Sequence, residues 1–145
     1  MDSIRIDTGI KKIQINDGPE FIEFNPSDIS FAERFYQLMK DFEVKQVEYQ
    51  ARLDKIDANK ELLDANGVPA NLPEGLALLR EEGEFIRERI DQLFGEDTSH
   101  KVFGNALSLE MFESFFTQIT PFIQTARAAK IIKYQKVPHK KRVMS

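Results

Sequence analysis

Apolar and polar residues alternate over much of the first 24 residues. The isoleucines of "SIRID" share one face, and so do the last two of "IKKIQI". "EFIEF" follows after the pair Asp17-Gly18, which favours a tight turn because Gly accepts a positive φ. The pattern predicts a hairpin over residues 10–24, either alone or with residues 3–7 as a third strand. So small a sheet must pack against helices to be stable.

After residue 25 the apolar positions recur at helical spacing. Asn25 is predicted as the N-cap of a first helix, with Pro26 at the first helical position. Apolar residues then recur from Phe31 to about Ala65, where Asn66-Gly67 would stop the helix. Such a helix would be ~57 Å long at ~1.5 Å per residue. That length exceeds a compact domain, so the helix must kink, break or project as a hairpin arm, and we favour a break or bend within "RLDKIDANK".

A second helix follows the loop "ANGVPANLPEG". Asn71 is its predicted N-cap, Pro73 lies near its start, Phe94 is its last buried residue and Gly95 stops it. Its apolar residues keep heptad spacing, and Gly83 is the one position of the heptad without a side chain: Leu72, Leu76, Leu79, Gly83, Ile86, Ile90 and Leu93. We expect this seam to face the first helix in an antiparallel helical hairpin, against Phe42, Tyr49 and Ile56.

A third helix is predicted after Ser108, its N-cap, and Pro121 should kink it near Ile119 or split it. Its wide apolar face consists of Leu109, Phe112, Phe115, Phe116, Ile119 and Ile123. The favoured interpretation of this face is a hydrophobic core. The alternative is a groove for a partner helix, because the aromatic residues cover more than one side. The candidate partner-binding residues are Phe112, Phe115, Phe116, Phe122, Ile131, Lys133 and Tyr134.

These elements predict an α+β fold within one domain. The chain has 145 residues, enough for a real core. We expect a domain over residues 1–137, with a β region at about 3–24, a helical region at about 26–135, and a mobile tail at 138–145. The sequence has 12 Phe and no Trp, so that core should consist largely of phenyl rings. There is no Cys, which excludes disulfides and thiolate metal sites.

Charge is distributed unevenly along the chain. Seven basic residues and no acidic ones lie between Arg127 and Ser145, although the net charge of the whole chain is −4. An acidic body argues against a nucleic-acid-binding domain, whose folded part usually carries a basic face. A contact of the tail with nucleic acid is the less favoured alternative to a solvated tail. The basic residues of the tail are Lys136, Lys140, Lys141 and Arg142.

The segment "LFGEDTSHKVFGN" groups Asp97, Ser99 and His100 within four residues. We interpret it as a joint between helices, anchored by Phe94 and Phe103. Adjacent side chains diverge in an extended segment, and the nearby acids do not have a recognised metal-ligand spacing. The acids of "REEGEFIRERID" alternate with arginines, as on a solvated helix face. We therefore expect no catalytic residue, no metal and no cofactor.

No apolar run approaches the ~18 residues of a membrane span, and the first residues lack the pattern of a signal peptide. We expect a cytoplasmic protein without membrane contact. We also expect self-association, because the predicted helices are too long for a globule of this size.

One combination of features carries a resemblance: a hairpin ending in "EFNPSD", a charged helical hairpin, "FGED" and "VFGN", an aromatic helix, and a basic end at "AAKIIKYQKV". From about Ile10 to Val137 the chain resembles the small tail-assembly chaperone-type proteins of long-tailed phages and prophages of Gram-positive bacteria. The resemblance implies a non-catalytic factor without cofactor that keeps the helical tape-measure protein soluble before the tail tube assembles. The alternative function is a helical adaptor or regulatory module for protein–protein interaction.

Overall fold

The structure, a computed structural model, describes residues 1–57 and 63–125. Its sheet is one antiparallel hairpin of β1 (Lys11–Gln14) and β2 (Phe21–Phe24), in which Ile13 lies opposite Ile22. The predicted hairpin is confirmed, but the positive φ values of its turn lie at Asn16 and Asp17 (52° and 56°) and not at Gly18 as predicted. The predicted third strand is wrong, because residues 1–10 form no strand.

The first helix, α1 (Ile29–Asp57), begins later than predicted. The Asp28 carboxylate accepts a hydrogen bond from the Ser30 N–H at 2.9 Å, as an N-cap side chain does. Asn25, the predicted cap, instead accepts from the backbone N–H and the hydroxyl of Ser27. Two capping residues lie three positions apart, and the one nearer the helix caps it.

The end of α1 also differs from the prediction. The helix is unbroken through Asp57, so no break lies in the described part of "RLDKIDANK", and its last three residues lie outside the described range. Residues 63–65 are not helical, and Leu63 instead forms an isolated bridge with Pro69. A continuous helix to Ala65 is therefore wrong.

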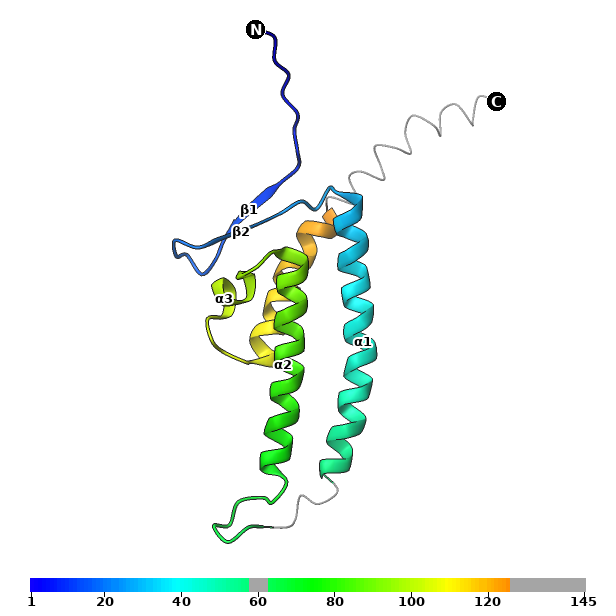
Figure 1. The fold of residues 1–145 in the computed structure, drawn as a ribbon, viewed down its shortest axis with the longest axis vertical. Helices are drawn as coiled ribbons and strands as arrows, with labels where there is room; N and C mark the ends of the chain where they lie inside the picture. The colour runs from blue at the N-terminus through cyan, green and yellow to red at the C-terminus, as the bar shows by residue number, and fades with distance from the viewer. Residues whose placement is uncertain (58–62, 126–145) are drawn as a thin grey trace, which may run out of the picture.

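The second helix, α2 (Leu72–Phe94), runs antiparallel to α1 (Figure 1). Asn71 precedes it as predicted but makes no side-chain cap hydrogen bond, and its amide donates to the Ile56 carbonyl at 3.2 Å. This bond ties the end of α1 to the start of α2. The predicted stop is confirmed, since Gly95 follows Phe94 with a φ of +118°.

The face of α2 that meets α1 lies mainly beside the predicted heptad seam, although Ile86 and Leu93 of the seam also border hollows lined by α1. Arg89 pairs with Asp41 of α1 at 2.8 Å, and the Phe85 ring lies 5.9 Å from the Phe42 ring. Leu78, one position away from the seam, is buried. The helix period places all three of these α2 residues on one stripe beside the seam.

The heptad seam instead faces the last part of the described chain. A Cβ added at Gly83 would lie 3.2 Å from Leu107 and 3.5 Å from Phe112. Ile90, further along the seam, is fully buried in the core. Leu76 and Leu79, nearer the start of α2, are 56% and 40% exposed. The seam is therefore covered over its second half and open over its first.

Two shorter helical segments provide this cover. The chain leaves α2 through α3 (Thr98–Phe103) and is helical again over residues 109–125. Ser108 caps the latter as predicted, accepting from the Met111 N–H at 3.3 Å. The helix continues across Pro121 without interruption, so the predicted split is wrong. Helix 109–125 lies beside one half of the α1–α2 hairpin and leaves the other half projecting (Figure 1).

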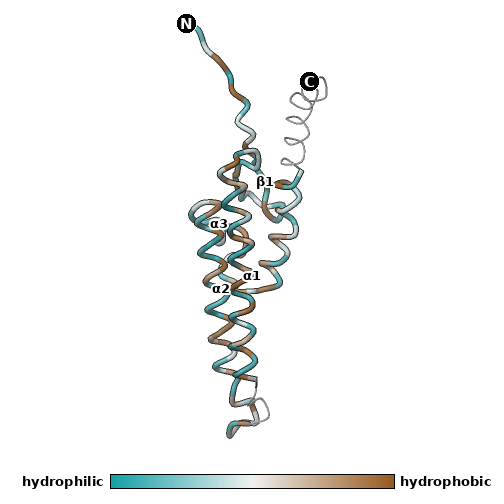
Figure 2. The backbone as a smooth tube through the Cα atoms, turned by 90° about the vertical axis from the view of Figure 1, so that its right-hand side faces the viewer, coloured by the Kyte–Doolittle hydropathy of each residue, from teal (hydrophilic) through white to brown (hydrophobic). Residues whose placement is uncertain are grey.

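The core lies where the sheet, α3 and helix 109–125 meet the covered half of the helical hairpin. Phenyl rings fill it, as the composition predicts, with mostly edge-to-face contacts at centroid distances of 4.8–5.7 Å among Phe24, Phe31, Phe94, Phe103, Phe112 and Phe115. Such pairs contribute ~0.5–1.5 kcal/mol each beyond their buried area. Figure 2 shows that hydrophobic residues also occur along α1 and α2 in the half of the hairpin that projects beyond this core.

Candidate functional site

Helix 109–125 presents apolar side chains in two directions, and each direction opens onto a hollow. We call the hollow between α1, α2 and this helix the three-helix groove. We call the hollow between β1 and this helix the sheet cleft. Both are large enough to hold side chains of a partner.

The three-helix groove has a volume of about 550 Å³ and an aromatic floor. Phe42 of α1 contacts Phe85 of α2 at 5.9 Å between ring centroids, and Phe116 of helix 109–125 at 5.2 Å. Lys45, Glu82 and Glu113 are the charged residues among those that line it. The groove thus combines a wide apolar surface with charges, which suits one face of an amphipathic helix.

Burial changes the ionisation of groups in this groove. It raises the pKa of Glu82, since the carboxylate loses solvation on the inner side of α2. Burial also raises the pKa of the Tyr49 hydroxyl, with the charge of Glu81 as a further cause. Lys45 binds Glu48 at 3.3 Å and lies 5.4 Å from the Phe85 ring centroid. A cation on a bound partner would therefore be favoured beside Glu82.

The apolar stripe of α2 continues beyond helix 109–125 onto the projecting half of the hairpin. Leu72, Leu76 and Leu79 follow Gly83 backwards along the same stripe of α2, and all three are exposed. The three leucines have the spacing i, i+4 and i+7, which places them on one side of the helix. We call them the leucine stripe.

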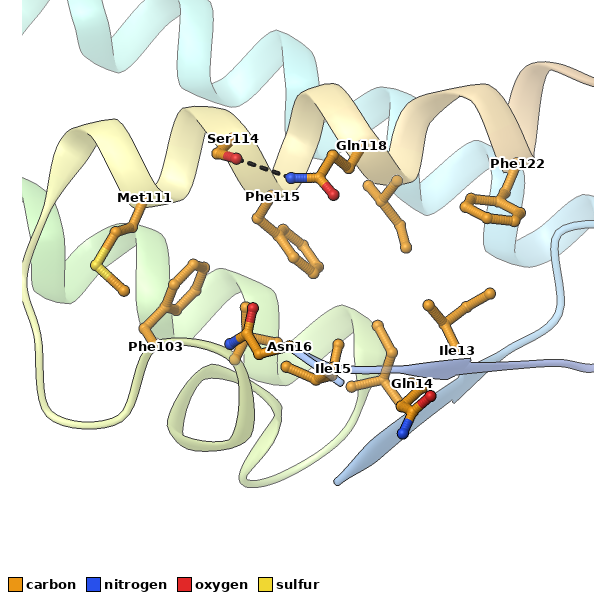
Figure 3. Close-up of a pocket in the computed structure, with 13 residues that line it drawn as sticks. Ile13, Gln14, Ile15, Asn16, Phe103, Met111, Ser114, Phe115, Gln118 and Phe122 are labelled. Carbon is orange, nitrogen blue, oxygen red and sulfur yellow. Dashed lines mark hydrogen bonds between the residues drawn. The ribbon is translucent and has the colours of Figure 1, made fainter. Parts of the chain in front are cut away.

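The sheet cleft has a volume of about 450 Å³. Figure 3 shows Ile13 and Ile15 on the strand side and Phe115 and Phe122 on the helix side. Polar groups lie at its edge, where the Gln118 amide donates to the Ser114 hydroxyl at 2.9 Å (Figure 3). The residues that line this cleft carry no charge, so an apolar occupant fits it best.

The candidate partner-binding residues are separated by the fold. Phe112 and Phe115 are 2% and 7% exposed in the core, so a partner reaches them only if that core opens. Phe116 is half-buried at the groove, and Phe122 is 40% exposed at the cleft. The remaining candidates lie outside the described residues: Ile131, Lys133, Tyr134, Lys136, Lys140, Lys141 and Arg142.

The polar segment after Gly95 is a structural joint. Ser99 is buried, and its N–H and hydroxyl donate to the two carboxylate oxygens of Asp91 at 2.7 and 2.8 Å. Asp97, the residue before α3, makes no side-chain cap bond, so Asp91 of α2 caps α3 from outside it. Phe94 and Phe103 are buried as predicted, whereas α3 itself was not predicted. His100 is exposed, whereas the neighbouring Ser99 is buried.

Sequence reasoning missed Asp91, because it lies eight residues before Ser99 and looks like a solvated acid on a charged helix. The available signal was the buried side of the helix, since Asp91 lies between Ile90 and the end of α2 at Phe94. Within residues 1–57 and 63–125, no three or more His, Cys, Asp or Glu residues converge as a metal site would require. No helix in that part of the chain has the length and apolar character needed to span a membrane.

Comparison with curated proteins gives no match, and neither does comparison with solved structures. Comparison with family models gives one that matches residues 17–145, from the turn of the hairpin onward, and its description is "Family of unknown function (DUF6673)". The chain therefore belongs to the DUF6673 family.

Proposed function

We propose that this protein is a non-catalytic assembly factor that binds a helical segment of a partner protein. On the resemblance described above, we propose a tail assembly chaperone of a phage or prophage, whose client is the tape-measure protein. The observation that carries the proposal is the open half of the α2 seam. An apolar stripe that is closed by helix 109–125 at one end is exposed as the leucine stripe at the other.

The geometry supports a helix as the occupant. Helix 109–125 packs over Gly83 and covers Ile90, which lie on the same stripe as Leu76 and Leu79. A client helix placed end to end with helix 109–125 would continue the same three-helix packing along the projecting half. Apolar anchors on the client at i, i+3, i+4 and i+7 would meet the leucine stripe.

The expected affinity is modest. Burying one exposed Leu contributes ~1.5–3 kcal/mol at most, and ordering the client opposes this gain. A net binding free energy of ~8 kcal/mol corresponds to a dissociation constant on the order of micromolar. A chaperone that hands its client on needs such reversible binding.

Charge would set orientation and encounter rate more than affinity. The raised pKa of Glu82 reflects a carboxylate that lacks full solvation, so a basic residue on the client is favoured there. Removal of residues 136–145, which the structure does not describe, should slow association and weaken its salt dependence.

The test is co-expression of the full chain with overlapping fragments of the tape-measure protein from the same genome. The readouts are the soluble fraction of each fragment and its dissociation constant by calorimetry. Leu76→Glu/Leu79→Glu should lower the affinity at least tenfold. Val44→Glu/Val47→Glu is the matched control, because those exposed residues lie on the side of α1 away from Tyr49 and the groove.

Two results would overturn parts of the proposal separately. If no tape-measure fragment binds but another helical protein does so through the leucine stripe, the protein is a helical adaptor. If a fragment binds and both double variants bind it equally well, the proposed client is correct, but the leucine stripe is not where it binds.

A further inference from the structure

Residues 3–7 have a strand pattern but no strand partner. Ile4 and Ile6 alternate with Ser3, Arg5 and Asp7, yet the two isoleucines are 85% and 73% exposed. Figures 1 and 2 both show this segment extending away from the rest of the molecule. Such an alternating segment can pair with the unpaired edge of a sheet, including that of another chain. We call residues 3–7 the arm.

The direction of the arm is set by a fixed junction. The Asn25 amide donates to the Thr8 carbonyl at 2.7 Å, and the Asp7 carboxylate accepts from the Gly9 N–H at 3.1 Å. Gly9 has a φ of +76°, and a Cβ there would lie 2.0 Å from the Ser27 hydroxyl. Both the φ and the contact favour glycine here, and from this junction residues 3–7 lead away from the body (Figure 1).

The sheet has a matching free edge. Among residues 1–57 and 63–125, β1 pairs with β2 alone, and the Ile15 N–H donates to the Glu20 carbonyl at 2.9 Å. Hydrogen-bonding residues alternate along an antiparallel ladder. The backbone groups of Lys12 and Gln14 therefore point away from β2, toward the free edge. The sheet cleft lies beside the same strand.

We propose that the arm of one copy adds as an antiparallel strand to β1 of a second copy, with its isoleucines filling the sheet cleft. Pairing Ile6 with Ile13 puts Ile4 opposite Ile15 and Asp7 opposite Lys12. In this register the isoleucines pair with one another on one face of the sheet. On the other face the negative Asp7 lies opposite the positive Lys12. The register also puts Arg5 opposite Gln14, so that the arm meets backbone groups that are otherwise unpaired.

The exchange is reciprocal, because each copy carries both the arm and the cleft. Two such contacts related by a two-fold axis make a closed dimer. The cleft of about 450 Å³ is uncharged and lined by Ile13, Ile15, Phe115 and Phe122, among others. Two isoleucine side chains suit that volume and chemistry better than a polar ligand would. The inference does not depend on the proposed chaperone function.

The first test measures mass by light scattering at ~100 μM, where a dimer of micromolar affinity is populated. The natural chain should be a dimer, and Ile4→Asp/Ile6→Asp should reduce it to monomer. Ser3→Asp/Arg5→Gln is the control. It lowers the net charge by the same amount as Ile4→Asp/Ile6→Asp, but on the other face of the arm, and it should stay dimeric. Leu76→Glu/Leu79→Glu should also stay dimeric, which separates this contact from the leucine stripe.

The second test uses disulfide trapping, since the natural chain has no Cys to interfere. Arg5→Cys and Gln14→Cys, mixed as two separate proteins, should form a cross-linked heterodimer, because hydrogen-bonded partners lie ~5.5 Å apart between Cα atoms. Mixing Arg5→Cys with Lys12→Cys, out of register, should cross-link at least tenfold more slowly.

A monomer at ~100 μM would overturn the proposal. A dimer that survives Ile4→Asp/Ile6→Asp would also overturn it. So would an intrachain disulfide in the double variant Arg5→Cys/Gln14→Cys, because that result would put the arm on its own β1.

Discussion

The two halves of the α1–α2 hairpin use the same apolar stripe in different ways. In the covered half the stripe packs against Leu107 and Phe112, and Ile90 is completely buried. In the projecting half the same stripe continues as exposed leucines. The sequence pattern is uniform, but in the described part of the chain only one half has a third helix to pack against. The covered half therefore contributes its stripe to the core, and the projecting half leaves its stripe exposed.

Polar contacts show the same contrast. In the projecting half, Arg52 binds Glu81 at 2.7 Å with both side chains largely exposed. Solvent screens such an exposed pair, so it contributes little to stability. In the covered half, Arg89 and Asp41 pair at 2.8 Å in a more buried setting. The Gln37 amide, followed by Arg89, lowers the pKa of Asp41. In the covered half, polar contacts therefore supplement the stability that the hydrophobic core provides.

The largest effect should come from truncating the core that closes the covered half. Phe103→Ala removes a ring that lies 4.8 Å from the Phe112 ring and 5.7 Å from the Phe115 ring. We expect a loss of ~3–5 kcal/mol in the free energy of unfolding, as for other buried aromatic truncations. Urea denaturation measures this loss, provided that the slope of unfolding free energy against urea concentration is the same for both proteins.

Leu76→Ala is the matched truncation in the projecting half. We expect a change within ~0.5 kcal/mol, as is usual at exposed positions. Equal losses for the two variants would show that the projecting half is as tightly packed as the core, and the contrast between the halves would be gone.

Local signals in the sequence predicted most of the fold. The hairpin, the antiparallel helices, the stop at Gly95 and the cap at Ser108 depend on residues close together in the chain. The third strand failed because the chain leads away from β1 at Gly9, which has a φ of +76°, and no periodicity predicts such a change of direction. The helix cap was placed wrongly because Asn25 and Asp28 both suit the position.

The candidate site was harder to predict. A heptad seam indicates which face of α2 is apolar, but not which neighbour covers it, and the assignment of that face to α1 was mainly wrong. The aromatic face of helix 109–125 likewise gave no means to separate Phe112, in the core, from Phe122, at the surface. Burial depends on distant segments, and Asp91 with Ser99 shows the same limit for a polar contact.

A smaller effect should follow from removing the carboxylate that joins α2 to α3. Asp91→Ala leaves the buried N–H and hydroxyl of Ser99 without their acceptors. An unsatisfied buried donor costs ~1–3 kcal/mol, and we expect a loss of that size in unfolding free energy. Glu88→Ala, an exposed acid one turn earlier in α2, should change stability by less than ~0.5 kcal/mol. A neutral Asp91→Ala would show that α3 does not need this cap.

Two adjacent acids should respond to pH in opposite directions. Burial raises the pKa of Glu82, so the folded state binds its proton more tightly than the unfolded state does. The stability from Glu82 is present below its unfolded pKa and is lost as the pH rises through the folded value. Glu82→Gln should therefore stabilise the protein at about pH 7, by less than ~1 kcal/mol because the group is partly solvated, and should have no such effect at about pH 3.

Glu81 provides the control with the opposite sign. The hydrogen bond from Arg52 lowers the pKa of Glu81, so its stabilisation is present above the unfolded pKa and lost as the pH falls through the folded one. Glu81→Gln should thus lower the melting temperature at about pH 7 and have little effect at about pH 3. Melting curves at the two pH values measure both variants. A lower melting temperature for Glu82→Gln at neutral pH would show that its carboxylate has a favourable partner in the groove.

The smallest effect should be that of His100→Ala. The imidazole is exposed, and the contribution of this residue to the helix end is its backbone carbonyl, which accepts from the Gly104 N–H at 2.8 Å and survives the substitution. We expect unfolding free energy to change by less than ~0.5 kcal/mol and partner affinity to stay the same. Denaturation and calorimetry with a bound partner fragment check both. A tenfold loss of partner affinity, with stability unchanged, would place a binding contact on α3, in the covered half of the molecule. The division between a stabilising half and a binding half would then be wrong.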